Sequence, residues 1–223
     1  PKSLLVDISL GHLNLIEAIL ETQDGGPIGT PELLEQLELE YSDSQRLMEF
    51  SLNYALQEDS RFEEVGSTGV FSWFLKRLEP KYVLETPIWL HLETNPADTE
   101  ALSPEDINVL QDIDDEHTFD IDFETQAPDT TTVSLALNYP HWRAGSLPIT
   151  PATSAVIPSA LESEHIQLTL KDAQTDEEIS AWVVRSKRYV IGLRDWYLAK
   201  GLIPGSIIEI STTSEPGVVS IDI

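Results

Sequence analysis

The spacing of apolar residues changes along the chain, and this change constrains the fold more than any other feature. Apolar side chains recur near the helical period in residues 9–22, 30–37 and 42–59. A Gly/Ser turn then separates two short β-prone runs, a pattern typical of a hairpin. Residues 1–80 are therefore expected to form three helices followed by a hairpin.

Residues 131–223 have the pattern of strands. Turn-forming residues separate six runs rich in branched and aromatic side chains, namely TVSLALNY, IQLTLKD, ISAWVVRS, RYVIGL, SIIEIS and VVSIDI. This spacing predicts an all-β barrel or sandwich. One helix is expected at LRDWYLAKG, where Gly201 would end it, and a second short helix before Pro158. The chain is thus predicted to be an α+β protein.

Residues 81–130 are expected to be an acidic connecting segment between these two domains. YVLETPIWLHLE has the composition of a strand, and SPEDINVLQDIDDE that of one or two helical turns. The acidic run 112–124 offers the carboxylates that hard cations prefer. It lacks the glycine and terminal glutamate spacing of an EF-hand loop, so a solvated segment is favoured and no metal site is predicted.

The charge of the chain limits its possible partners. The formal net charge is −26, with −10 in residues 1–80, −13 in 81–130 and −3 in 131–223. Such a protein repels phosphate backbones, so nucleic-acid binding requires a local basic patch in the last third. The chain has no cysteine, no apolar run long enough to span a membrane and no signal-peptide pattern at its start. A cytoplasmic location and no membrane partner are expected.

The sequence has no recognisable catalytic motif. P-loop, G-x-G-x-x-G, G-x-S-x-G and HExxH patterns are all missing, and the five histidines are widely scattered. Trp142, Trp182 and Trp196 are expected to pack in or near the core rather than to stack on bases. We therefore expect a protein that is not an enzyme and that needs no cofactor.

The order of three helices and a hairpin in the first 80 residues resembles the winged helix-turn-helix superfamily. In that superfamily the third helix usually reads DNA. Here the corresponding helix has Arg46 alone against Asp43, Glu49, Glu58 and Asp59. The resemblance implies the fold, but the acidic helix disfavours DNA reading, and winged helices also serve as protein-interaction modules.

The stretch from Arg143 to Ile210 resembles the B3-like pseudobarrel DNA-binding domains. RAGSLPIT, a short helical piece ending in AVIP, a hairpin, and KRYVIGLRDWYLAKGLIPGSIIEI follow one another in the order of that family. The resemblance implies a mostly-β pseudobarrel with one or two short helices that binds double-stranded DNA. GHLNLIEAIL and FSLNYALQEDSRFEEVG also resemble segments of a bacterial family with two such parts, and this implies no activity.

The positions that match the DNA-binding face of the B3-like family are basic. Residues 184–200 contain five basic residues and one acidic residue. The candidate nucleic-acid-binding residues are Arg143, Arg185, Ser186, Lys187, Arg188 and Arg194. The arginine and lysine side chains are expected to contact phosphates or base edges. The serine hydroxyl is expected to contact a phosphate. Ion pairs with the acidic middle or with a partner, or a merely solvated turn, are the alternatives.

Two functions remain in view at the level of sequence. The first is a DNA-associated protein whose C-terminal domain binds the duplex and whose acidic N-terminal part binds another protein. The second is an acidic adaptor, or nucleic-acid mimic, that recruits a basic partner. An enzyme has the least support.

Overall fold

The computed structural model describes residues 5–37, 45–91, 103–104, 131–160 and 163–223. The fold is α+β, as predicted, and the chain divides into two compact units. The first consists of Pro1–Leu84 with Ser159–Gln167, and the second of Glu85–Pro158 with Leu168–Ile223. In the described ranges, no helix is both long and apolar enough to cross a membrane.

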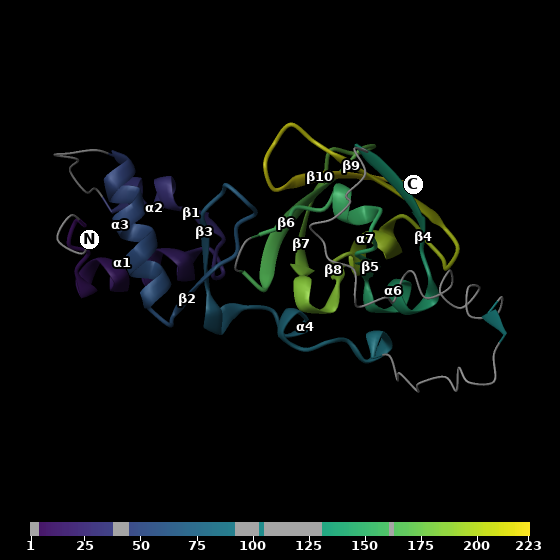
Figure 1. Ribbon diagram of the computed structural model, residues 1–223, viewed down its shortest axis with the longest axis horizontal. Coiled ribbons are helices and arrows are strands. Elements are labelled where there is room, and N and C mark those ends of the chain that lie inside the picture. The colour runs from purple at the N-terminus through teal and green to yellow at the C-terminus, as the bar shows by residue number, and fades with distance from the viewer. Residues whose placement is uncertain (1–4, 38–44, 92–102, 105–130, 161–162) are drawn as a thin grey trace. The chain divides into compact units, whose positions relative to one another are not determined.

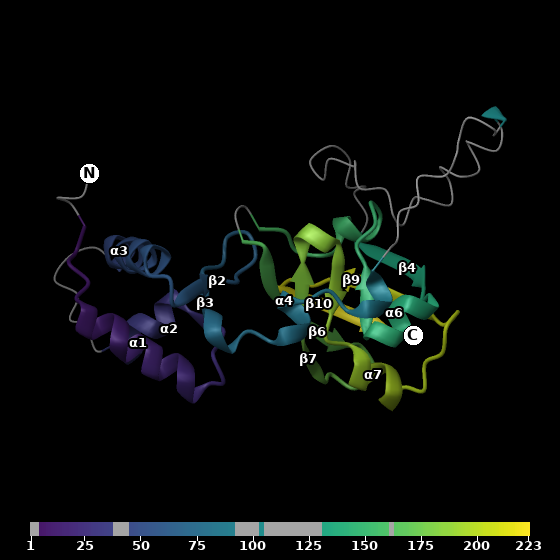
Figure 2. The same ribbon diagram turned by 90° about the horizontal axis from the view of Figure 1, so that it is seen from below.

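The first unit consists of three helices and a small sheet. Its elements are α1 (Leu10–Thr22), β1 (Ile28–Gly29), α2 (Thr30–Gln36), α3 (Gln45–Glu58), β2 (Phe62–Glu64), β3 (Ser72–Leu75), η2 (Lys76–Leu78) and α4 (Lys81–Leu84). The sheet has the order β1-β3-β2, and its strand pairs are antiparallel. Figure 2 shows the three helices grouped beside β2 and β3.

Local signals start the helices, and apolar side chains hold them together. Ser9 caps α1, because its hydroxyl accepts a hydrogen bond from the His12 amide while the His12 ring accepts one from the Ser9 amide. Helix α2 has a proline in its first turn, and its N-cap is Gly29. Leu20, Leu52 and other fully buried side chains of the helices then pack against the sheet.

The prediction of a strand in residues 82–93 is wrong for the part that the structure describes. This part forms α4 and the 3-10 turn η3 (Ile88–Leu90) instead. The carbonyl of Pro80 accepts a hydrogen bond from the Val83 amide, and that of Pro87 accepts one from the Leu90 amide. Proline favours such turn starts because its φ angle is fixed. The predicted helical turns after Pro104 and the acidic run lie outside the described residues.

The second unit is built on a seven-stranded sheet, β4-β9-β10-β6-β7-β8-β5, that curls into a half-barrel (Figure 1). Its further elements are β4 (Thr132–Ala136), α6 (Tyr139–Ala144), β5 (Ser146–Pro148), η6 (Thr153–Ala155), β6 (His165–Asp172), β7 (Glu178–Val184), η7 (Arg185–Lys187), β8 (Tyr189–Ile191), α7 (Arg194–Ala199), β9 (Ile207–Thr212) and β10 (Val218–Asp222). The six predicted strands and both predicted helical pieces are confirmed. The division between the units falls within β6.

The alternation of side chains along β6 explains how this sheet buries one face. Ile166, Leu168, Leu170 and Asp172 are buried, and the residues between them are partly exposed. Strand β10 pairs with β6 in parallel, and the other strand pairs for which a register is determined are antiparallel. The buried face therefore ends at a carboxylate, which needs a partner inside the unit.

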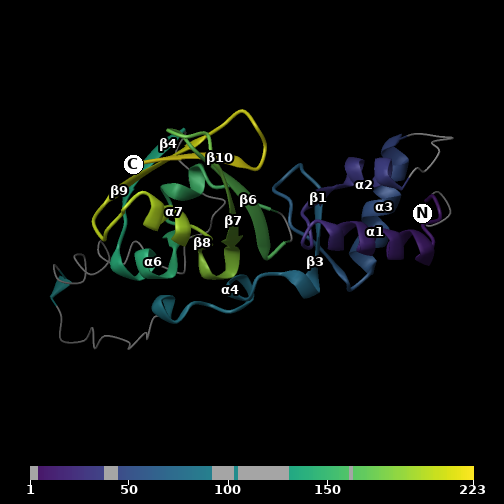
Figure 3. The ribbon, with the colours of Figure 1, turned by 180° about the vertical axis from the view of Figure 1, so that it is seen from behind.

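Helix α6 was not predicted, because its six residues lie between a strand and a turn. The side chain of Asn138 caps it by accepting a hydrogen bond of 3.0 Å from the His141 amide. Gly145 ends it with a φ angle of 70°, in the left-handed region that glycine adopts without strain. Helix α6 contacts β5 and α7, and Figure 3 shows α6 and α7 near β8.

Candidate nucleic-acid interface

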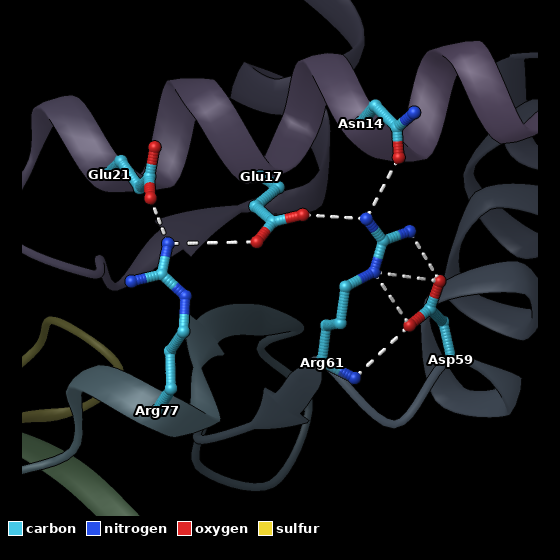
Figure 4. Close-up of polar contacts among 6 residues, drawn as sticks. All are labelled: Asn14, Glu17, Glu21, Asp59, Arg61 and Arg77. Carbon is cyan, nitrogen blue, oxygen red and sulfur yellow. Dashed lines mark hydrogen bonds and ion pairs between the residues drawn. The ribbon is translucent and has the colours of Figure 1, made fainter.

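The basic residues of the first unit are largely bound to carboxylates. Arg61 forms the centre of the network that Figure 4 shows. Its guanidinium donates to both carboxylate oxygens of Asp59, at 3.0 Å from Nε and 2.6 Å from Nη2. Nη1 donates to Glu17 at 2.6 Å and to Asn14 at 2.9 Å. The side-chain hydrogen bond from Arg61 lowers the pKa of Asp59, and the same contact raises the pKa of Arg61.

Two further cations of this unit are neutralised in the same way. Arg77 pairs with Glu21 and lies 3.6 Å from Glu17, and Lys76 lies 3.4 Å from Glu63. Helix α3 contributes only Arg46 as an exposed cation. A phosphate needs a cation that is not already neutralised, so this unit offers little to a nucleic acid.

Arg143 lies on the last turn of α6 and is exposed. Its guanidinium carbon lies 5.3 Å from the ring centroid of Trp89, a cation–π contact. The Trp89 ring in turn meets Tyr139 edge-on, with 6.3 Å between the ring centroids. The aromatic contact orients the cation without neutralising it, since its N–H groups keep their capacity to donate.

Arg194 lies beside Arg143, although the two are far apart in the sequence. It is the first residue of α7, and its Nη1 donates a hydrogen bond of 2.6 Å to the Arg143 carbonyl. The two helices approach so closely here that a Cβ atom built on Gly145 would lie only 2.6 Å from the Cβ of Arg194. The fold therefore joins these two predicted residues into one group.

The other candidates form a second group between β7 and β8. Arg185, Ser186 and Lys187 make the 3-10 turn η7, and both Ser186 and Lys187 are exposed. Arg188 follows with a φ angle of 56°, in the left-handed region, and its carbonyl accepts a hydrogen bond of 2.8 Å from the Ile149 amide. The turn is thus tied to the segment that follows β5.

The two groups lie at opposite ends of the paired strands β5 and β8. Ser146 faces Ile191 at the end that holds Arg143 and Arg194, and Pro148 faces Tyr189 at the end that holds η7. Three residues of strand separate these ends by about 10 Å. The predicted site is therefore two neighbouring groups rather than one cluster.

The sequence around both groups contains a single carboxylate, Asp195. Residues 131–158 have no Asp or Glu and carry Arg143, and residues 179–200 have five cations against Asp195, which follows Arg194 on α7. Over the part of the chain that the structure describes, Arg143, Lys187 and Arg194 form no ion pair with Asp or Glu. This portion of an acidic protein therefore keeps an excess of positive charge.

Lys200, the fifth basic residue of the predicted patch, is occupied. Its ammonium lies 2.7 Å from Oδ2 of Asp172, whose side chain is only 1% exposed. Trp196 Nε1 donates to the same oxygen at 2.6 Å, and the Gln174 and Thr175 amides donate to Oδ1. Burial alone would raise the pKa of Asp172, but these donors, Lys200 foremost, hold it well below its usual value.

The predicted roles of the other singled-out residues are mixed. Trp182 and Trp196 are buried, as predicted, and Trp142 is half-buried with Nε1 bonded to the Leu202 carbonyl at 2.8 Å. His165, which the sequence places in no ligand group, lies together with Glu63 and Glu79. No motif connects these three residues, because only the fold of the first unit brings them together.

Comparison with models of known protein families gives no match, and a search of curated proteins also finds no similar sequence.

Proposed function

We propose that the second unit binds double-stranded DNA through Arg143, Arg185, Ser186, Lys187, Arg188 and Arg194. The observation that carries this proposal is that Arg143, Lys187 and Arg194 form no ion pair with Asp or Glu among the described residues, on segments where Asp195 is the single carboxylate. In a protein of net charge −26, such cations are where a polyanion experiences attraction rather than repulsion.

The two groups are suited to different phosphates of one duplex. A duplex carries about one phosphate charge per 1.7 Å of axis, so groups about 10 Å apart both find phosphates within reach. Arg143 and Arg194 present guanidinium forks, which bind phosphate with two parallel hydrogen bonds. The η7 turn adds the Lys187 ammonium and the Ser186 hydroxyl. The resemblance to B3-like pseudobarrels supports the same face.

We further propose that the first unit is a winged-helix module that binds a basic protein rather than DNA. The order α1-β1-α2-α3-β2-β3 supports this fold. The pairing of Arg61, Lys76 and Arg77 with carboxylates leaves Arg46 and Lys81 as the cations without an ion pair among the described residues of this unit. Its remaining acidic side chains attract positive charge.

Anisotropy of a fluorescently labelled duplex, titrated with the full chain at low salt, tests the DNA proposal. We expect saturable binding, and Arg143→Gln or Arg194→Gln should each weaken it about tenfold, since hydrogen bonds to charged groups contribute about 1.5–3 kcal/mol. Lys171→Gln is the matched control: it removes one positive charge from β6, where Lys171 pairs with the exposed Asp176 at 3.3 Å. Equal effects of all three variants, or no binding by the parent chain, would refute the proposal.

A second candidate function is an acidic adaptor that recruits a basic protein, and the net charge of −13 in residues 81–130 favours it. A competition experiment with DNA distinguishes the two functions. An adaptor that mimics nucleic acid loses its basic partner when DNA is added, and Arg143→Gln leaves that interaction unchanged.

A further inference from the structure

Glu79 is the most unusual carboxylate in the first unit. Its side chain is 0% exposed, and neither of its oxygens has a hydrogen-bond partner. It follows η2, and Pro80 separates it from α4. Buried carboxylates are ordinarily satisfied by donors or paired with a cation at short range. No described hydrogen-bond donor of the protein satisfies this buried carboxylate, so we looked for another kind of partner.

Two more ligand-type side chains converge on this carboxylate. Nδ1 of His165 lies 3.6 Å from Oε2 of Glu79 and 3.9 Å from Oε1 of Glu63. This nitrogen is also buried and without a hydrogen-bond partner. One ligand atom from each of the three residues lies within 4.8 Å of the other two.

An ion pair alone accounts poorly for this spacing. Charge-assisted N–H···O bonds are about 2.7–2.9 Å long, well below the 3.6 Å between His165 and Glu79. Around a tetrahedral ion with ligands at about 2.1 Å, adjacent ligand atoms are about 3.4 Å apart. The observed distances are thus closer to those of atoms that share a metal ion than to those of hydrogen-bonded atoms.

We propose that Glu63, Glu79 and His165 bind a zinc ion. Imidazole nitrogen suits Zn²⁺, whereas Ca²⁺ and Mg²⁺ prefer sites made of oxygen ligands alone. Three protein ligands leave a fourth position for water, as in open zinc sites. The site is independent of the proposed DNA contacts, which belong to the second unit.

The surroundings of the site fit this assignment. Lys76 lies 3.4 Å from Oε2 of Glu63, which leaves Oε1 directed to His165. The side chains of Glu63 and His165 are 20% and 12% exposed, so a metal ion has access from solvent.

A bound zinc ion would fasten two distant parts of the chain within the first unit. Glu63 belongs to β2, and His165 belongs to the returning segment Ser159–Gln167. That segment is otherwise tied by hydrogen bonds of the Ser159 carbonyl with Thr68, at 2.8 Å, and of the Gln167 amide with the Val65 carbonyl, at 2.9 Å. The ion would add coordination bonds that connect this segment to β2 and to Glu79.

Calorimetric titration of the chelator-treated full chain with ZnCl₂ tests the site. We expect one tight zinc per chain, with MgCl₂ giving no comparable isotherm. His165→Ala and Glu79→Gln should each weaken this step at least about 100-fold, which is the upper range for loss of a supporting partner of a metal ligand. His91→Ala is the control, since His91 is exposed and bonded to the Thr86 carbonyl at 3.1 Å.

The variants also separate a specific site from general binding to the acidic chain. Glu79→Gln removes only a charge, so it should fold, and circular dichroism checks this. Equal zinc affinity of the parent chain and both variants would overturn the proposal, as would the absence of a tight step in the parent. Loss of the tight step in both variants, with His91→Ala unchanged, supports it.

Discussion

Two buried carboxylates illustrate how single residues decide the chemistry of this protein. Asp172 receives hydrogen bonds or ion-pair contacts from Lys200, Trp196 and two backbone amides. Glu79 is just as buried and receives no hydrogen bond. The first is a completed structural site. The second has unused ligand capacity, which is why we assign a zinc ion to it and none to Asp172.

Replacement of Asp172 by asparagine should destabilise the protein by about 3 kcal/mol at neutral pH, because it leaves Lys200 unpaired in a largely buried position. Urea unfolding measures this change. Asp176→Asn is the control: Asp176 is 86% exposed and pairs with Lys171 on the surface, so its loss should cost less than about 1 kcal/mol. Equal losses in the two variants would contradict this account of Asp172.

The contribution of Asp172 also has a defined pH dependence. Its pKa is lower in the folded protein than in the unfolded chain, so its stabilisation is complete above the usual aspartate value of about 3.9. As the pH falls below that value, protons bind the unfolded chain first and the stabilisation is lost. The difference in unfolding free energy between the parent and Asp172→Asn should therefore shrink below about pH 4.

At the level of elements, the strands were predictable and α6 was not. The alternation in IQLTLKD and the other runs specifies a sheet with one buried face, and each run is a strand. Helix α6 depends on an asparagine cap, an early proline and a terminal glycine around only six residues. Helix α7 is equally short, but Gly201 after it marked its end, whereas the β-prone run TVSLALNY reaches Tyr139, the first residue of α6.

The close approach of α6 and α7 depends on one glycine. Gly145→Ala should cost about 2–5 kcal/mol, because it adds left-handed strain and a clash with Arg194. Gly201→Ala is the matched control: Gly201 has a φ angle of 65° but no atom within 4 Å of a built Cβ, so only strain of about 1–2 kcal/mol remains. Chemical denaturation compares the two, and equal costs would show that the contact contributes nothing.

The candidate sites were predictable to different degrees for the same physical reason. Arg185 through Arg188 are adjacent in sequence, so their charge was visible before the fold was known. The approach of Arg194 to Arg143 depends on the packing of two helices. Glu63 and His165 come together only in the folded first unit. Sequence reveals local groups, whereas groups assembled from distant segments need coordinates.

At the scale of the whole molecule, negative charge is distributed unevenly. Residues 1–130 carry −23 of the net −26, and the cations of the first unit are largely paired. The second unit keeps cations on segments where Asp195 is the single carboxylate. A duplex that approaches the molecule is thus repelled by most of the chain and attracted by one portion. Long-range repulsion should make DNA binding weaker than the number of local cations alone would give.

The salt dependence of duplex affinity tests the central claim most directly. The logarithm of the association constant should fall linearly with the logarithm of salt concentration, and if Arg143, Lys187 and Arg194 each neutralise a phosphate, these three contribute about −2.7 to the slope. The Arg143→Gln/Arg194→Gln double variant should reduce the steepness of this slope by about 2. A slope that the double variant leaves unchanged, or the absence of duplex binding at the lowest salt concentration, would contradict the claim.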